Sequence, residues 1–177
     1  RLRWRSGENI VVLVGMLDDQ KFGMWLHGHA VLDGDKAAIR FEDHEPITYR
    51  QLDLWVDEIA ARMSSEFGIG PGMRVAHIGL NDPALVALLF ACARIGAVLV
   101  PVNWRLAAAE VAFIVRDCMP EIVFFGHEFA EVAAETASQI DKIAKPISLL
   151  SDWQCGDAGT HSNEFETDTG RLEAPLL

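Results

Sequence analysis

Hydrophobic and polar positions alternate along this chain in blocks that are typical of strands and helices. Short apolar runs indicate buried strands, and longer blocks with apolar residues at helical spacing indicate helices. The predicted strands are 74–79, 97–102, 122–125 and 147–150, and the predicted helices are 48–67, 84–95, 107–118 and 129–143. Alternation of this kind predicts an α/β fold, with a mostly parallel sheet and helices on both faces.

The first part of the chain has weaker patterns. Residues 22–32 form a weak helical pattern, and residues 37–47 resemble a small hairpin around a polar turn. His27 and His29 form an H-x-H pair, but on a helix their side chains point about 200° apart. Because a zinc site needs a third or fourth ligand, we favour a surface role for both over metal binding.

Three helix ends have clear signals in the sequence. Thr48 and Gln51 form a T-x-x-Q capping box, and Gly68 suits a left-handed cap. Asp82 and Pro83 are typical of an N-cap and a first helical residue. Since a carboxylate would already occupy the positive end of the 84–95 helix, we do not expect a phosphate to bind there.

Several other polar residues have structural interpretations. The charged residues of the 48–67 helix, which we expect to form a solvated face, are Asp53, Asp57, Glu58 and Arg62. His77 is inside a predicted strand, where a packed histidine is favoured over a catalytic one. Pro101 suggests that strand pairing stops there, because proline lacks the amide donor.

Two regions invite comparison with nucleotide-binding sites. The glycines of residues 68–72 follow a helix and precede a strand, the reverse of a dinucleotide fingerprint, so we interpret them as a turn. Asn103, Trp104 and Arg105 instead follow a buried strand. In open α/β sheets, ligands bind at the carboxyl ends of the strands, which makes these three residues the candidate ligand contacts.

Composition limits the classes of function. Half of the residues are hydrophobic and the net charge is −11, which argues against nucleic acid as a partner. No apolar run reaches the length of about 20 residues that spans a membrane. The apolar run Ile10–Leu17 is followed by two aspartates rather than by cleavage-site residues, which argues against secretion. Three scattered cysteines suggest no disulfide framework, so we expect a reducing, cytoplasmic setting.

Composition also divides the chain. We expect an N-terminal extension and first helix at residues 1–35, an α/β subdomain at 36–150, and an acidic loop at 151–177. The chain does not begin with Met, which suggests a piece of something longer.

Three passages in register resemble the adenylate-forming superfamily of acyl-CoA synthetases, luciferases and peptide-synthetase adenylation domains. Residues 47–52 (ITYRQL) are similar to its TYxEL element, 70–76 (GPGMRVA) to GPGDRVA, and 94–103 (RIGAVLVPVN) to K-x-G-x-x-x-x-P-x-[ND]. Residues 106–117 resemble the helix that follows. The resemblance covers about residues 20–150.

The resemblance implies a two-step reaction. ATP and a carboxylate give an acyl-adenylate with Mg²⁺ assisting, and coenzyme A then displaces AMP. Residues 103–106 look like the NxRL of the acyl-CoA synthetase branch, which favours a fatty or aromatic acid as substrate. Arg105 could hold a coenzyme A phosphate, although a plain surface arginine beside a helix start is the favoured interpretation. Trp104 and Asn103 are further candidate coenzyme A or substrate contacts. Trp104 is favoured as a packing residue, and a homo-oligomer is left open.

The departures from the family limit this reading. The Ser/Thr/Gly-rich phosphate loop ending in Pro-Lys is not in residues 1–177, and Ala107 replaces the usual Thr at a helix start. We therefore expect only the first subdomain of a synthetase, with no catalytic residue or metal ligand, and no activity or bound cofactor for this piece alone. The alternative is a standalone, truncated α/β module for binding or assembly.

Overall fold

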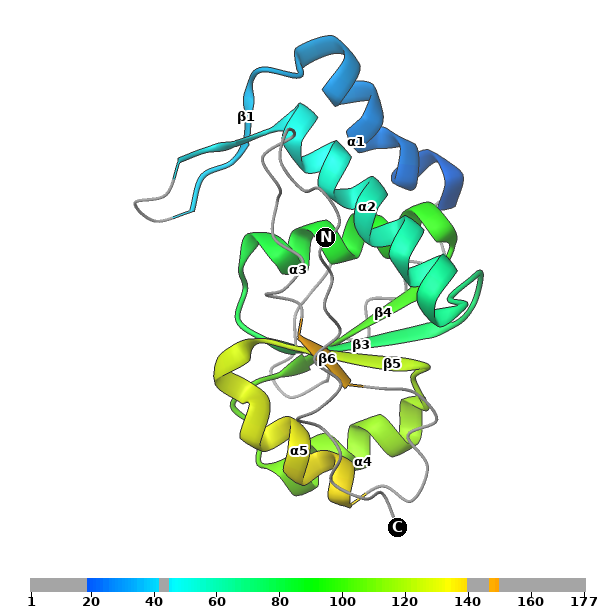
Figure 1. The fold of residues 1–177 in the computed structure, drawn as a ribbon, viewed down its shortest axis with the longest axis vertical. Helices are drawn as coiled ribbons and strands as arrows, with labels where there is room; N and C mark the ends of the chain where they lie inside the picture. Colours follow the sequence, from blue (N-terminus) through cyan, green and yellow to red (C-terminus); the bar gives the residue numbers. More distant parts are fainter. Residues whose placement is uncertain (1–18, 42–44, 140–146, 150–177) are drawn as a thin grey trace, which may run out of the picture.

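The protein forms an α/β structure in a computed structural model that describes residues 19–41, 45–139 and 147–149 (Figure 1). The helices are α1 (Asp19–Asp33), α2 (Tyr49–Phe67), α3 (Pro83–Ile95), α4 (Ala108–Cys118) and α5 (Ala130–Ser138), with a short 3₁₀ helix, η2 (His127–Phe129). The strands are β1 (Ala37–Ile39), β2 (Ile47–Thr48), β3 (Arg74–Gly79), β4 (Val98–Asn103), β5 (Ile122–Phe125) and β6 (Ile147–Leu149).

The central sheet has the order β4-β3-β5-β6, and all three of its strand pairings are parallel. Helices α2 and α3 cover one face, α4 and α5 cover the other, and α1 lies outside α2 and α3 (Figure 1). Strands β1 and β2 form a separate antiparallel hairpin. The predicted fold class, a parallel sheet with helices on both faces, is confirmed.

Each sheet face has its own apolar core because successive strand residues point to opposite faces. Val75, Leu99 and Phe124 pack with α2 and α3. Ala76, Val100 and Val123 point the other way and pack with residues of α4. This alternation explains why the strands read as continuous apolar runs, since both faces of the sheet are covered.

Pro101 does not end the pairing of β4, so that expectation was wrong. The ladder between β3 and β4 continues through His77↔Pro101 to Gly79↔Asn103. Among the described strands, β4 is at the edge of the sheet. Proline is tolerated on an edge strand, where its missing amide can face away from the neighbour.

The helix ends predicted at Thr48 and Gly68 are confirmed. The Thr48 amide donates to Gln51 Oε1 at 2.9 Å, and the Gln51 amide donates to Thr48 Oγ1 at 3.2 Å. Gly68 and Gly96 end α2 and α3 with φ of 65° and 71°, a backbone conformation that glycine adopts without steric cost.

Asp53 is buried, which overturns the expectation that it lies on a solvated face. Its carboxylate binds Arg94 Nη2 at 2.7 Å and His27 Nδ1 at 2.8 Å. Asp57 also accepts a hydrogen bond from Arg94. These contacts join α1, α2 and α3, and we call His27, Asp53, Asp57 and Arg94 the ion-pair cluster. A helical pattern in one segment cannot reveal a partner 41 residues away.

Some predicted features lie outside the described residues. These are the acidic loop 151–177 and the N-terminal residues 1–18. The prediction of a helix over 129–143 was too long, because α5 ends at Ser138 and Gln139 is its C-cap. The division into segments 1–35, 36–150 and 151–177 stays a prediction. None of the helices in the described part of the chain is both long and apolar enough to cross a membrane.

Candidate functional site

The carboxyl ends of the parallel strands define the candidate site. Strands β3, β4 and β5 end at Gly79, Asn103 and Phe125, and their pairing is parallel and in register. The segments that follow the three strands therefore lie at one edge of the sheet. Ligands of open α/β sheets bind at this edge.

Asn103, the last residue of β4, begins a turn that continues through Trp104 and Arg105. Asn103 Oδ1 accepts a hydrogen bond from the Arg105 amide at 3.0 Å, and the Asn103 carbonyl accepts one from the Leu106 amide at 3.2 Å. An asparagine side chain that binds the backbone two residues on stabilises a turn. The Asn103 side chain therefore has a structural role in holding the Arg105 backbone.

Trp104 lies between the core and the solvent. Its ring is 5.8 Å from that of Phe129, with the planes tilted by 44°, and it packs against the core on the α4 face. The guanidinium carbon of Arg105 lies 4.3 Å from the Trp104 ring centroid. Such cation–π stacking contributes about 0.5–1 kcal/mol at exposed sites. Trp104 thus packs as expected, and it also supports the exposed Arg105 side chain.

The amino end of α3 opens on the same edge but is already capped. Asp82 Oδ1 accepts a hydrogen bond from the Leu85 amide at 2.9 Å, and Pro83 is at the start of the helix. The carboxylate binds one of the free amides and places negative charge at the positive end of the helix. This confirms the predicted cap and leaves the helix end unsuited to phosphate.

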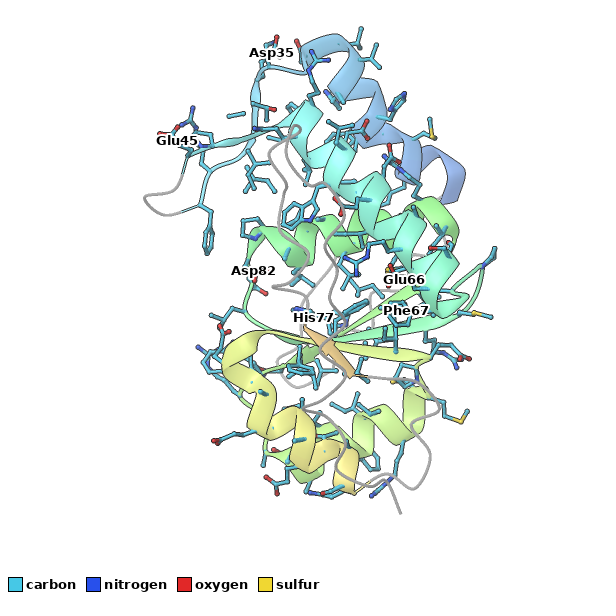
Figure 2. The ribbon with its side chains drawn as sticks, viewed as in Figure 1. Asp35, Glu45, Glu66, Phe67, His77 and Asp82 are labelled. Atoms are coloured by element: carbon cyan, nitrogen blue, oxygen red, sulfur yellow. The ribbon has the colours of Figure 1, made fainter. Side chains whose placement is uncertain are left out.

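His77 is packed inside the sheet beneath this cap (Figure 2). Burial lowers its pKa below the usual value, and the Asp82 carboxylate acts in the opposite direction. A Cβ on Gly79 would lie only 2.6 Å from His77 Cε1. Gly79 is thus required by packing, and it gives no sign of a phosphate-binding role.

A half-open apolar pocket of about 360 Å³ lies on the α3 side of this edge. Its walls come from the hairpin, the first turns of α3 and strand β4, and its lining residues include Phe41, Val86, Leu89, Leu99 and Pro101. Asn81 and Asp82 supply its polar atoms. The apolar walls of this pocket suit an apolar group, and the charge of Asp82 would repel a carboxylate.

The described residues provide no metal centre and no activated thiol. No three His, Cys, Asp or Glu side chains of that part of the chain gather as metal ligands. Burial raises the pKa of the Cys92 thiol to about 12, so it stays protonated at neutral pH. A ligand contact by Arg105 and its neighbours at this edge stays a prediction.

The family model described as AMP-binding enzyme matches residues 26–173. The chain therefore belongs to the AMP-binding enzyme family. This match includes all the elements that form the sheet edge, and it agrees with the resemblance found in the sequence.

Curated relatives act on several acids. The chain is 39% identical to an indoleacetate–CoA ligase of Aromatoleum aromaticum, over 59% of this chain and 20% of the relative. It is 34% identical to a long-chain-fatty-acid–CoA ligase of Mycobacterium tuberculosis, over 63% of this chain and 21% of the relative. The chain thus spans about a fifth of the length of these two relatives.

Solved structures have the same fold. A fatty acyl CoA synthetase of Mycobacterium tuberculosis superposes with a TM-score of 0.67 at 28% identity, covering 76% of this chain and 28% of that one. The N-terminal domain of FACL13 from the same organism gives 0.66 at 25% identity, covering 81% of this chain and 39% of the other. The described fold corresponds to part of the N-terminal domain of acyl-CoA synthetases.

Proposed function

We propose that this chain is the N-terminal portion of an ATP-dependent acyl-CoA synthetase. The whole protein activates a carboxylic acid as an acyl-adenylate and transfers the acyl group to coenzyme A. Membership of the AMP-binding enzyme family is the observation that carries this proposal. Relatives named as CoA ligases of indoleacetate and of long-chain fatty acids support a hydrophobic acid as the substrate.

Arg105 is our candidate contact for a coenzyme A phosphate. It is exposed, it follows the carboxyl end of β4, and its guanidinium is stacked on Trp104. No described carboxylate forms an ion pair with it. A planar guanidinium can bind two phosphate oxygens at once, which suits this role.

This chain alone is proposed to be inactive. Among the described residues at the sheet edge, Arg105 is our one candidate cation for a ligand, whereas phosphoryl chemistry needs several groups that stabilise the developing charge. Mg²⁺, which the family implies, would supply such charge when bound, but the described residues do not form its site.

ATP–pyrophosphate exchange tests both statements. The full-length protein is assayed with long-chain fatty acids and with aryl acids, and the 177-residue chain is assayed in parallel. We expect acid-dependent exchange, followed by thioester formation with coenzyme A, from the full-length protein only. Exchange by the 177-residue chain would disprove its inactivity, and a full-length protein without exchange for any acid would favour the binding-module alternative.

A further inference from the structure

The half-open pocket between the β1–β2 hairpin, α3 and β4 has one charged residue in its lining. All of its lining residues except Asn81 and Asp82 are apolar, and its volume is about 360 Å³. Ligand pockets typically have volumes of about 300–1,000 Å³, with apolar walls and a few placed polar groups. Asp82 lies just before the first residue of α3 (Figure 2). The pocket therefore combines apolar walls with a single negative charge.

The charge of Asp82 is only partly offset by its surroundings. Its Oδ1 accepts a hydrogen bond from the Leu85 amide, but a carboxylate has about four acceptor positions. The amino end of α3 supplies roughly half of a positive charge. Among the described residues, no Lys, Arg or His forms an ion pair with Asp82. Burial lowers the pKa of the neighbouring His77, which therefore stays neutral at neutral pH.

We propose that this pocket binds an apolar ligand that bears a protonated amine. The alkyl or aryl part lies against the apolar walls, where it loses contact with water, and the ammonium group donates to the Asp82 carboxylate. A ligand with a carboxylate is disfavoured, because its charge has the same sign as that of Asp82. The ligand is thus chemically different from the acid substrate proposed above, and neither proposal depends on the other.

The volume of the pocket sets the size of the ligand. A water-sized group takes about 30 Å³, so a pocket of about 360 Å³ holds roughly ten such groups. Octylamine is of this size, and 1-octanol and octanoate have the same chain length with a different end group. At neutral pH the amine is protonated and the acid is ionised, as in the side chains of lysine and glutamate. The three compounds therefore separate the effect of charge from that of the apolar chain.

The competing occupant of the pocket is an apolar segment of the parent protein from outside this chain. The chain spans about a fifth of the length of two relatives, so the remainder could supply such a segment. A purely apolar segment would take water away from the Asp82 carboxylate without supplying a donor, which is unfavourable. This cost favours a ligand with a cation.

Titration of the 177-residue chain with the three compounds tests the proposal, by calorimetry and by NMR shifts of backbone amides. We expect octylamine to bind at least threefold more tightly than 1-octanol, and octanoate to bind more weakly than 1-octanol. Asp82→Asn removes the charge but keeps the helix cap, because asparagine caps as well as aspartate. This variant should bind the amine and the alcohol equally. No binding of octylamine, equal binding of octanoate, or an unchanged preference for the amine in Asp82→Asn would overturn the proposal.

A second pair of variants tests the location of the site. Val86→Trp fills the pocket and should weaken octylamine binding at least tenfold. The matched control is Val31→Trp on α1, where the valine is 70% exposed, and it should leave binding unchanged. Amide shifts should concentrate at residues 81–89. Binding that survives Val86→Trp, or shifts centred on α1, would show that the amine binds elsewhere and would overturn the proposal.

The full-length protein provides the last test. We expect it to bind octylamine with an affinity within threefold of that of the 177-residue chain. A full-length protein that does not bind octylamine would show that another part of the protein covers the pocket, and the proposal would be wrong. None of these measurements depends on catalysis, so the proposal can fail while the proposed function stands.

Discussion

Arg94 and Arg105 lie at opposite ends of the sheet and have different surroundings. Because β3, α3 and β4 follow one another with parallel strands, α3 runs back from the carboxyl edge of the sheet toward its amino edge. Arg94, in the last turn of α3, is therefore far from Arg105, which follows β4 at the carboxyl edge. The Arg94 side chain is 15% exposed and binds Asp53 and Asp57, whereas Arg105 is exposed and stacks on Trp104.

The difference predicts a structural role for Arg94 and a binding role for Arg105. The charge of Arg94 is neutralised by two carboxylates, so little remains to attract a substrate. The charge of Arg105 faces solvent at the edge where open α/β sheets bind ligands. Substitutions at the amino end should therefore change stability, and substitution of Arg105 should change substrate binding.

The largest expected effect is at the ion-pair cluster. Arg94→Met leaves the buried Asp53 carboxylate without its main partner, and breaking a buried pair in this way costs about 3–5 kcal/mol. Urea denaturation of the 177-residue chain gives the free energy of unfolding. The matched control is Arg62→Ala, whose pair with Glu66 is more exposed and should contribute at most about 1 kcal/mol. Equal losses for both variants would contradict a structural role for Arg94.

Gly79 gives a second test, at the carboxyl edge. Gly79→Ala places a methyl group 2.6 Å from His77 Cε1, and overpacking of this kind costs about 1–3 kcal/mol. Adding His77→Val should recover much of the loss, because the smaller side chain makes room. If the double variant is no more stable than Gly79→Ala alone, the His77 contact is not the reason for the glycine.

His77 also predicts a pH dependence. Because burial lowers its pKa in the folded state, the unfolded state binds the proton more readily, and stability falls as the pH drops below about 6.5. The slope contributed by His77 is at most about 1.4 kcal/mol for each pH unit. His77→Leu should remove this component when unfolding is measured from pH 7.5 to 5. An unchanged slope would mean that His77 is not buried as a neutral group.

The smallest effect is expected at the start of α4. Ala107 is the N-cap residue and provides no side-chain hydrogen bond, although its amide donates to Glu110 Oε2 at 2.9 Å. Ala107→Thr would complete the capping box and should add about 0.5–2 kcal/mol of stability in urea denaturation. The control is Ala109→Thr inside the helix, which should be neutral or slightly destabilising. A gain at residue 109 as large as at 107 would argue against capping.

Much of the fold could be predicted because its signals are local. The Thr48 box, the Gly68 cap and the Asp82 cap each need only a few adjacent residues. The partners of Arg94 could not be predicted, because the ion-pair cluster joins three helices that are separate in sequence. Asp53 and Asp57 share a face of α2, but only the packing of α1 and α3 shows that this face is buried.

The candidate site was predictable to a lesser degree. The carboxyl edge follows from the strand pattern, which placed Asn103, Trp104 and Arg105 at the end of a buried strand. The turn that they form comes from the structure. The tilted ring contact between Trp104 and Phe129 depends on the neighbouring strand β5 and its following loop, and no pattern in residues 97–106 indicates it. The contacts of all three residues with coenzyme A or substrate stay predictions.

The central claim is that Arg94 has a structural role and Arg105 binds ligand, and the most direct test is the KM for coenzyme A of Arg105→Ala in the full-length protein. A charge-assisted hydrogen bond contributes about 1.5–3 kcal/mol, so we predict that KM for coenzyme A rises at least about tenfold. ATP–pyrophosphate exchange should not change, because that step does not use coenzyme A. The control Arg50→Ala, beside the β1–β2 hairpin, should leave both unchanged. An unaltered KM for coenzyme A in Arg105→Ala would contradict the account.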